Sequence, residues 1–319
     1  MDLKRRQFLK TSFASLGAVT AGAEVATARA FVKADEAPAK QPKNPFSTDP
    51  VATVKLTDSI MTSRLGFGTG MSGYQRSAQL TRMDRKKAES LLNYAYDKGI
   101  RFFDCADLYG THEVVSSTLK DKPRDSYVVV SKLWPHGGGI PEQERPSAEV
   151  VVKRFLKELN TDYLDVLQLH CMMKPDWRGE LESYVEDLEK LKKEGLIRAH
   201  GVSCHSVGSI DTGGDDPWVD TMHVRLNTSG ARMDGTFEEN VNVIRKAHDN
   251  GKGTICMKVV GEGTMRERAD RMSSIDRVIR EDIIDVFIVG FEELWQIDEL
   301  IENVEISLKG IEAERKAQA

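Results

Sequence analysis

The chain reads YVVVSKLW at residues 127–134, SAEVVVKRFLKELN at 147–160 and YLDVLQLH at 163–170. The first and third segments are apolar runs of strand length, and the segment between them has the composition of an amphipathic helix. A strand, a helix and a second strand in succession predict a βαβ unit, whose two strands run parallel in one sheet.

The same alternation of apolar runs and amphipathic segments extends in both directions from this unit. The other predicted strands are residues 63–70, 101–106, 197–204, 221–227, 254–260 and 285–291. Eight such units in about 260 residues predict an α/β fold, a closed (β/α)₈ TIM barrel. A doubly wound open sheet is the alternative, but GFGTGMSG (66–73) lacks the GxGxxG spacing that usually follows its first strand.

Not every segment between the strands has equally clear helical character. In ESYVEDLEKLKKEG (182–195), Tyr184, Leu188 and Leu191 share one face and the charged residues take the other. By contrast, SVGSIDTGGDDPWV (206–219) has three glycines and little periodicity, so we predict a loop there.

The first thirty residues differ in composition from the rest of the chain. Paired arginines, Arg5 and Arg6, precede an Ala/Gly-rich stretch that ends in ARA, and this arrangement is similar to a twin-arginine (Tat) export signal. It predicts cleavage near Ala30, a periplasmic location and contact with the Tat machinery; a basic N-terminus without this role is the alternative. Glu24 and the scarcity of Leu and Ile argue against a stable membrane span.

The remaining chain is predicted to have a short linker and one domain. Residues 31–50 contain four prolines and few large apolar groups, which is typical of a linker, and residues 51–319 form the predicted barrel domain. The full chain has a formal net charge of −5, and loss of five basic and two acidic groups with residues 1–30 leaves −8. Neither value suits a nucleic-acid partner or an anionic membrane surface.

The four cysteines match no CxxC or zinc-ligand spacing, and we predict no metal site. Each cysteine lies in or just after an apolar strand, where a thiol usually acts as a small hydrophobic side chain. A structural disulfide in an exported protein is the alternative.

Asp104, Lys132 and His170 stand at the ends of three consecutive predicted strands. In such barrels the carboxyl ends of the strands and the loops after them build the active site. Side chains alternate along a strand, so the three residues can all point into one mouth of the barrel. There Asp104 would offset much of the cost of burying Lys132.

Tyr109 lies on the loop that follows Asp104, within reach of the same mouth. A free phenol has a pKa of about 10, and an adjacent ammonium group lowers that value. The sequence therefore predicts that Tyr109 donates a proton to an oxygen that becomes negative, with Lys132 lowering the pKa of Tyr109 and His170 orienting the oxygen or helping to relay the proton. Taken singly, each residue has an ordinary structural explanation. Asp104 and Lys132 could be an ion pair that closes the barrel, His170 a core histidine and Tyr109 a loop aromatic.

Four motifs together resemble the aldo-keto reductase family: FFDCADLYG (102–110), VVSKLW (129–134), YLDVLQLH (163–170) and GVSCHS (201–206). The resemblance extends over about residues 50–310. It implies a barrel capped by a β-hairpin in VATVKLTDSIMTS, and reduction of an aldehyde or ketone, or oxidation of the alcohol, with NADPH or NADH.

The resemblance also implies a role for each residue of the tetrad. Tyr109 is the acid/base, Lys132 tunes it, Asp104 holds Lys132 and His170 orients the carbonyl. The residues that the resemblance assigns to the cofactor are Gly68, Thr69, Ser203, His223, Met257, Gly261, Gly263, Gly290 and Phe291.

Several of these cofactor positions depart from the family pattern. Ser203 stands where the family holds the nicotinamide carboxamide, but His223 replaces a glutamine that shares this task, and Met257 replaces a stacking tyrosine. Gly290 and Phe291 stand where NADPH-dependent members carry Lys-Ser, and Gln296 where they carry an arginine for the 2′-phosphate. We therefore expect a weaker NADPH preference than is usual, with NADH as a plausible cofactor.

Two other classes of function remain open from the sequence. The departures around the nicotinamide allow a barrel that binds a nucleotide or another ligand with little turnover. A hydrolase with paired carboxylates is the second alternative, but only Asp104 ends an inward-facing strand position with partners. Trp134, Trp218 and Tyr74 are candidates for the wall of a substrate pocket.

Overall fold

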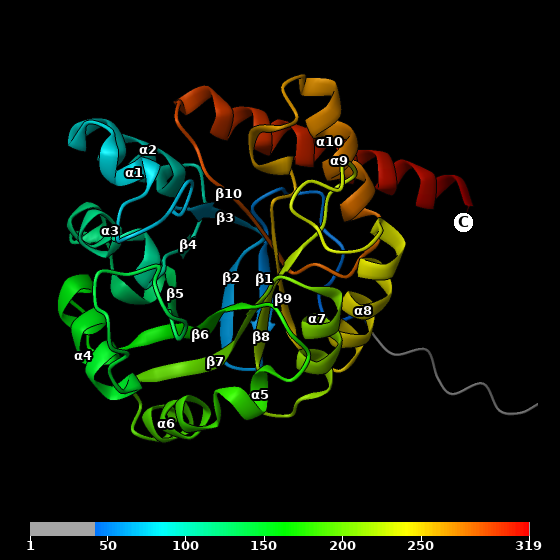
Figure 1. Ribbon diagram of the computed structural model, residues 1–319. Helices are drawn as coiled ribbons and strands as arrows, with labels where there is room; N and C mark the ends of the chain where they lie inside the picture. The colour runs from blue at the N-terminus through cyan, green and yellow to red at the C-terminus, as the bar shows by residue number, and fades with distance from the viewer. Residues whose placement is uncertain (1–41, 319) are drawn as a thin grey trace, which may run out of the picture. The chain divides into compact units, whose positions relative to one another are not determined.

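In the computed structural model of the chain, residues 42–318 are described. Parallel strands form a closed barrel in the order β10-β3-β4-β5-β6-β7-β8-β9, and helices surround it (Figure 1). The barrel strands are β3 (Leu65–Gly68), β4 (Phe102–Asp104), β5 (Val128–Leu133), β6 (Leu164–Met172), β7 (Ile197–Cys204), β8 (Thr221–Arg225), β9 (Gly253–Met257) and β10 (Val286–Val289). The predicted (β/α)₈ barrel is confirmed.

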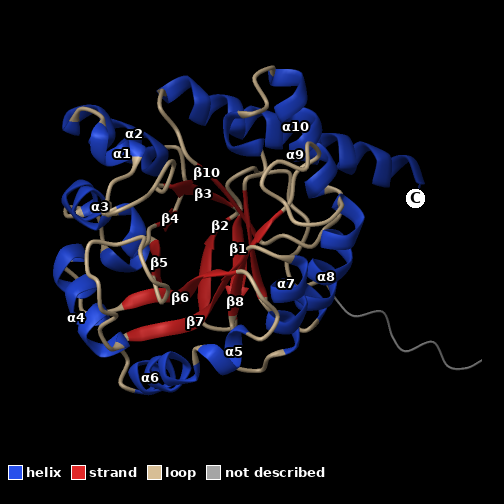
Figure 2. Cartoon of the chain, viewed as in Figure 1, coloured by secondary structure: helices blue, strands red, loops and turns tan. Residues whose placement is uncertain are grey.

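Helices cover the outside of the barrel, as Figure 2 shows in blue around the red strands. The longer ones are α2 (Arg85–Asp97), α3 (His112–Leu119), α4 (Ala148–Leu159), α6 (Glu182–Lys193), α7 (Val207–Asp215), α8 (Phe237–Asp249), α9 (Arg268–Ile279) and α10 (Leu294–Gln318). Short helices α1 (Gln79–Arg82) and α5 (Trp177–Glu180), and 3₁₀ turns η1 (Asp107–Tyr109), η2 (Arg124–Ser126) and η3 (Gly261–Gly263), lie in the connections.

Successive side chains of each strand enter two different apolar cores. In β4, Phe102 belongs to the core inside the barrel with Val130 and Val166, whereas Phe103 belongs to the core between barrel and helices. This follows from the period of two along a strand. The next inward position after Phe102 is Asp104, which therefore points into the barrel at its carboxyl end.

A β-hairpin closes the opposite end of the barrel, as the resemblance implied. Strands β1 (Thr53–Thr57) and β2 (Ile60–Ser63) pair antiparallel, and Leu56 and Ile60 are fully buried in the inner core. The carboxyl end, where the polar strand residues gather, is the opposite end from this hairpin.

Part of the predicted linker packs against the barrel. Lys43 Nζ donates to the backbone oxygens of Leu56 (2.8 Å) and Lys252 (3.1 Å) and forms an ion pair with Asp285 Oδ2 at 2.7 Å. Asn44 Nδ2 donates to Asp285 Oδ1 at 2.9 Å. The compact unit thus begins at Pro42, earlier than the predicted boundary at residue 51.

The loop predicted for residues 206–219 is wrong, because helix α7 occupies residues 207–215. Ser206 caps this helix by accepting a hydrogen bond from the backbone nitrogen of Ser209. Its glycines permit close packing: a Cβ at Gly213 would lie 2.9 Å from Met222 Cε, and one at Gly214 would lie 3.0 Å from Ala247 Cβ. Tertiary packing therefore overrides the low helix propensity of glycine.

The predicted export signal, residues 1–30, lies outside the described residues. Within residues 42–318, no helix has the length and apolarity needed to cross a bilayer. Each of the four cysteines, all of which the structure describes, is a free thiol.

Candidate active site

The predicted tetrad meets at the carboxyl end of the barrel. Asp104 ends β4, Lys132 lies in β5 and His170 lies in β6, while Tyr109 ends the 3₁₀ turn η1 that follows β4. The backbone register pairs Asp104 with Val130 and Lys132 with Gln168 across neighbouring strands. The parallel strands thus bring residues far apart in the sequence to one site.

Lys132 is almost completely buried, at 1% exposure, and two oxygens surround its ammonium group. It forms an ion pair with Asp104 Oδ1 and donates to the backbone oxygen of Cys105 at 3.0 Å. Burial alone raises the pKa of Asp104, but the charge of Lys132 and the hydrogen bond from His223 lower it below its ordinary value. Asp104 is therefore an anion that compensates the buried ammonium.

Tyr109 lies between Lys132 and His170. Its hydroxyl is 3.5 Å from His170 Nε2, and Lys132 Nζ lies 5.2 Å from the centre of its ring. Burial and the Asp104 charge raise the pKa of Tyr109 well above its ordinary value, so the predicted lowering of this pKa is wrong for the site as it stands. The reason is that the ammonium is bonded to Asp104 and faces the ring.

His170 is neutral at physiological pH. Burial and the charge of Lys132 lower its pKa well below the ordinary histidine value. Its ring packs edge-on against Trp134, with ring centres 5.4 Å apart, and its buried Nδ1 has no hydrogen-bond partner among the described residues. A neutral imidazole in this position can orient a carbonyl oxygen through an N–H group.

Two glycines that the sequence analysis passed over make room for the Tyr109 ring. A Cβ at Gly70 would lie 2.2 Å from Tyr109 Cζ, and one at Gly73 would lie 2.5 Å from Tyr109 Cδ1. The loop after β3 therefore packs its backbone directly against the phenol ring. The signal was present in GMSG (70–73), directly after the first barrel strand, but it is too common to indicate this contact.

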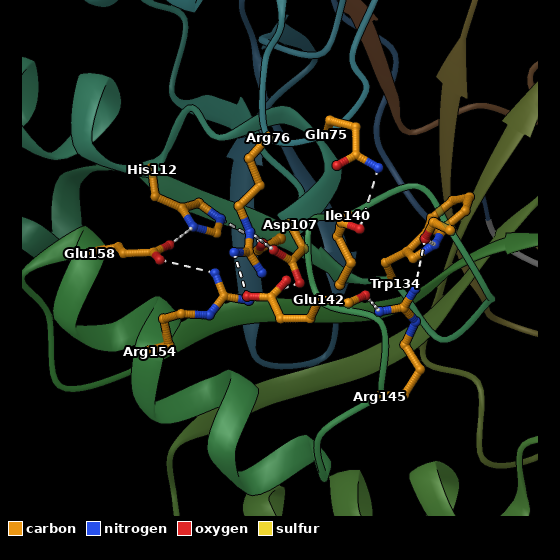
Figure 3. A network of polar contacts seen from close by, with 12 residues as sticks. Gln75, Arg76, Asp107, His112, Trp134, Ile140, Glu142, Arg145, Arg154 and Glu158 are labelled. Atoms are coloured by element: carbon orange, nitrogen blue, oxygen red, sulfur yellow. Dashed lines mark hydrogen bonds and ion pairs between the residues drawn. The ribbon is translucent and has the colours of Figure 1, made fainter.

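A buried carboxylate holds the turn that carries Tyr109. Asp107, which is 2% exposed, pairs through Oδ1 with Arg76 Nε (2.7 Å) and through Oδ2 with Arg154 Nη2 (2.8 Å), as Figure 3 shows. Arg154 also pairs with Glu158 at 2.9 Å, and Glu158 contacts His112 Nδ1 at 2.6 Å. This network connects the loop after β3, the Tyr109 turn and helix α4.

The loop after β5 belongs to the same network (Figure 3). Arg76 Nη1 pairs with Glu142 Oε1 at 2.6 Å, and Arg145 Nη1 donates to the Glu142 backbone oxygen at 2.7 Å. Trp134 Nε1 and Arg145 Nη2 both donate to the Gly138 oxygen at 2.7 Å. Trp134 is thereby fixed beside His170, as one wall of the site.

An elongated cavity of about 410 Å³ extends from the tetrad toward helix α10. Asp104 and Tyr109 line one part of it, and Trp295, Gln296 and Glu299 line another. The predicted cofactor residues in its lining are Gly68, Met257, Gly263, Gly290 and Phe291. The glycine backbone at its edge suits a phosphate-containing ligand, because glycine allows close approach to a phosphate.

The other predicted cofactor residues lie outside this lining. Thr69 Oγ1 donates to the backbone oxygen of Asp104 at 2.7 Å, and Ser203 is fully buried beside His205. Gly261 has a φ of 65° in the turn η3, where a Cβ would lie 2.3 Å from Thr264 Oγ1. Thr69, Ser203 and Gly261 therefore lie behind the residues that line the cavity.

His223 contacts the tetrad itself. Its Nε2 lies 2.9 Å from Asp104 Oδ1, and its Nδ1 lies 2.6 Å from Gln168 Oε1. Both ring nitrogens therefore face oxygen atoms inside the barrel, and a neutral ring, which has a single N–H group, can donate to only one of them. Burial and the Lys132 charge lower the pKa of His223 to about 4, so the ring is neutral at pH 7.

The α10 end of the cavity contains both carboxylates and arginines: Arg271 is paired, whereas Arg266 has no ion-pair partner among the described residues. Arg271 forms two bonds to Glu299, at 2.7 and 2.9 Å, and Gln296 Oε1 accepts from the backbone nitrogen of Glu292 at 2.7 Å. Glu292 is a further carboxylate in the lining. Within the described residues, no group of three or more His, Cys, Asp or Glu is placed to hold a metal ion.

Residues 64–310 match the aldo/keto reductase family, and the chain belongs to this family. A solved aldo-keto reductase from Pseudomonas aeruginosa is 26% identical and superposes with a TM-score of 0.65 over 80% of this chain and 95% of its own. A Klebsiella pneumoniae aldo-keto reductase solved with NADPH has a TM-score of 0.61 at 21% identity over 82% and 93% of the two chains, a likeness of fold.

Curated relatives match over a shorter range. A Glycine max aldo-keto reductase is 31% identical over 169 residues, which are 50% of this chain and 47% of the relative. The aldo-keto reductase YhdN of Bacillus subtilis is 31% identical over 160 residues, 48% and 46% of the two chains. The chain thus spans about half the length of the curated relatives that it matches.

Proposed function

We propose that the protein is an NAD(P)H-dependent oxidoreductase that reduces an aldehyde or ketone, or oxidises the corresponding alcohol. The observation that carries this proposal is the joint position of Tyr109, His170, Lys132 and Asp104 at the end of a cavity of about 410 Å³ that glycine backbone borders. Membership of the aldo/keto reductase family supports it.

The chain's own residues supply position and a proton. The nucleotide, when bound, supplies the hydride that the carbonyl carbon accepts. His170 would orient the carbonyl oxygen, and the Tyr109 hydroxyl, protonated at neutral pH because its pKa is raised, would donate its proton as that oxygen becomes negative. Lys132 would stabilise the phenolate left behind, with Asp104 holding the ammonium in place.

Tyr109→Phe tests this proposal because it removes the proton and keeps the ring. We expect kcat for carbonyl reduction to fall by about 10²–10⁴-fold, the usual contribution of a positioned general acid. Nucleotide affinity, measured by fluorescence titration, should change little. Tyr184→Phe is the matched control, since its hydroxyl donates to the backbone oxygen of Pro146 and not to a residue of the tetrad, so its loss should not affect turnover.

The same measurements separate the alternatives. Turnover that survives Tyr109→Phe would contradict the proposed role of the phenol. Nucleotide binding without oxidation of NADH or NADPH, across a panel of aldehydes, ketones and quinones, would favour a ligand-binding barrel. Two observations motivate that alternative: both ring nitrogens of His223 face Asp104 and Gln168 inside the barrel, and Met257 offers no aromatic face.

We infer that the protein binds NADH at least as well as NADPH. Arg271 is already paired with Glu299, Gln296 is bonded to the backbone before α10, and Glu292 places a negative charge in the cavity lining. A 2′-phosphate would meet repulsion from Glu292 there and could not use Arg271, which leaves Arg266 as the lining arginine without a carboxylate partner among the described residues. Dissociation constants for both nucleotides should be similar or favour NADH, and Glu292→Lys should shift the ratio toward NADPH by about tenfold.

A strong NADPH preference in the wild-type protein would overturn this inference. The Glu292→Lys variant shows whether the cofactor preference depends on this charge, because it reverses the charge of one lining residue and leaves the Arg271–Glu299 pair in place.

We also propose that residues 1–30 direct export through the Tat machinery to the periplasm, where the enzyme would arrive folded, with its nucleotide bound. The paired Arg5 and Arg6 and the ARA sequence before residue 31 support this proposal. Replacing both arginines by lysine should retain the protein in the cytoplasm in cell fractionation. Export of that variant would contradict the Tat route. Mature periplasmic protein that contains no nucleotide would contradict export with the nucleotide bound.

A further inference from the structure

Arg225 is a cation at the mouth of the barrel that has no carboxylate partner in the described part of the chain. It ends strand β8, two residues after His223, and so belongs to the same inward-facing row as Thr221 and His223. His223 reaches Asp104 from this row, which places Arg225 one position higher, toward the open end.

The surroundings of Arg225 leave its charge uncompensated. Its Nη1 donates to the backbone oxygen of Arg232 and its Nη2 to His205 Nδ1, both at 2.6 Å. These two acceptors are neutral. Its Nε is buried and has no hydrogen-bond partner among the described residues. Burial lowers the pKa of Arg225, although a guanidinium stays charged at any physiological pH.

The nearby acid is already committed to other cations. Glu262 pairs with Lys258 at 2.6 Å and with Arg232 at 2.9 Å. Burial raises the pKa of the Cys171 thiol, whose sulfur lies 3.2 Å from His205 Nδ1, so the thiol is neutral at pH 7 and supplies no counter-charge. Three cations and one carboxylate thus stand together at this edge of the mouth.

The position of Arg225 is on the substrate side of the tetrad. Its partner His205 has its ring centre 6.3 Å from that of His170, the residue that orients the carbonyl in the proposed reaction. The elongated cavity assigned to the nucleotide is lined by Lys258 and Glu262 near this edge, and its lining does not include Arg225.

We infer that Arg225 binds a carboxylate on the substrate, so that the substrate class is a carbonyl compound that also carries an anionic group. A partly buried guanidinium without a counter-charge gains from a carboxylate, which neutralises its charge. This inference rests on the proposed function for the carbonyl end of the substrate. The binding of the anion itself can be tested without turnover.

A matched pair of ligands isolates the charge. 4-(Hydroxymethyl)benzoate and its methyl ester share a ring and an alcohol and differ in one negative charge. Isothermal titration of the full chain should show the acid binding about ten- to a hundredfold more tightly, as expected for a desolvated charge-assisted pair. In Arg225→Gln this preference should disappear, whereas the affinity for the ester should change by no more than about threefold.

Two further variants control for charge and for folding. Arg225→Lys keeps the positive charge and loses the planar fork, so part of the preference should remain. Arg232→Gln removes a neighbouring exposed arginine that is already paired with Glu262, and the preference should survive. Thermal unfolding of each variant checks that the loop after β8, which Arg225 holds through the Arg232 oxygen, is intact.

The outcomes distinguish the inference from the proposed reaction. Two results would overturn the carboxylate site: wild-type protein that binds the acid no more tightly than the ester, or an Arg225→Gln variant in which the affinities for acid and ester fall equally. A tenfold loss of NADH affinity in Arg225→Gln with the preference unchanged would assign Arg225 to the nucleotide pyrophosphate and also overturn it. Arg225-dependent binding of the acid, with no reduction of 4-carboxybenzaldehyde or of any compound in the carbonyl panel, would keep the site and refute the reaction.

Discussion

At the scale of single residues, the site depends on charges that compensate one another in a buried place. Lys132 and Asp104 form the pair that the sequence predicts, and His223 adds a third member that the sequence does not predict. The family pattern suggested that position 223 faces the cofactor. The structure instead turns its imidazole onto Asp104, because the row Thr221, His223 and Arg225 faces the barrel interior.

His223 makes stability depend on pH in a defined direction. Its pKa is about 4 in the folded chain, where burial disfavours the charged ring, and about 6.5 in an unfolded chain. As the pH falls from 6.5 to 4, the unfolded chain gains a proton that the folded chain does not, so folding stability decreases. The loss from this residue reaches about 3 kcal/mol near pH 4 and is absent above pH 7.

His223→Gln should remove this contribution. The free energy of unfolding, measured by urea denaturation at several pH values, should fall less steeply for the variant than for the wild type between pH 6.5 and 4. His248→Gln is the comparison, because His248 lies at the end of helix α8, away from the tetrad. Parallel curves for wild type and His223→Gln would show that the ring is not buried in its neutral form.

The residue scale also shows where sequence reasoning ends. Residue types and strand ends were enough to predict that Asp104, Lys132, His170 and Tyr109 share one mouth. The direction of the Tyr109 pKa was not predictable, because it depends on whether the ammonium faces the hydroxyl or is taken up by Asp104. Arg225 was missed because an arginine at a strand end has no motif, and its missing counter-charge is visible only in three dimensions.

At the scale of elements, short connections rather than strands position the phenol. The turn η1 is held by Asp107 between two arginines, and the loop after β3 covers the Tyr109 ring with Gly70 and Gly73. Loops are the usual carriers of function on a rigid barrel. Here their geometry is fixed by buried charge and by backbone contact with an aromatic ring.

Gly73→Ala should impair catalysis through Tyr109. The added Cβ would lie 2.5 Å from Tyr109 Cδ1, so the ring or the loop must shift. Displacement of a catalytic group by about 1 Å costs on the order of 10²-fold in rate, so kcat should fall by about ten- to a hundredfold. Nucleotide affinity should change little, since Gly73 is outside the cavity lining.

Gly179→Ala is the matched control for this substitution. Gly179 lies in the short helix α5, and a Cβ there would meet no atom within 4 Å. Turnover should equal that of the wild type. Unchanged kcat in Gly73→Ala would mean that the loop after β3 adapts and does not fix the phenol.

The helix α7 shows a second limit at this scale. Gly213 and Gly214 argued for a loop, yet they allow the helix to approach Met222 and Ala247 closely. Neither neighbour is near in sequence, so a reading of local propensity could not include them.

At the scale of the whole molecule, alternation of strands and helices was sufficient to predict the barrel. The strands observed at 128–133 and 164–172 lie within two residues of the predicted segments, because each is an apolar run bounded by polar residues. The start of the compact unit was less predictable, since it depends on Lys43 reaching Asp285 across the sequence.

The hairpin β1–β2 closes one end of the barrel, where Leu56 and Ile60 pack into the inner core. Because the hairpin closes one end of the barrel, both reactants of the proposed reaction would have to reach the tetrad from the opposite, carboxyl end. The reactant that binds deeper in the site would then have to bind first and dissociate last. Product inhibition would then follow a compulsory order of loading, an order imposed by an element that touches neither reactant.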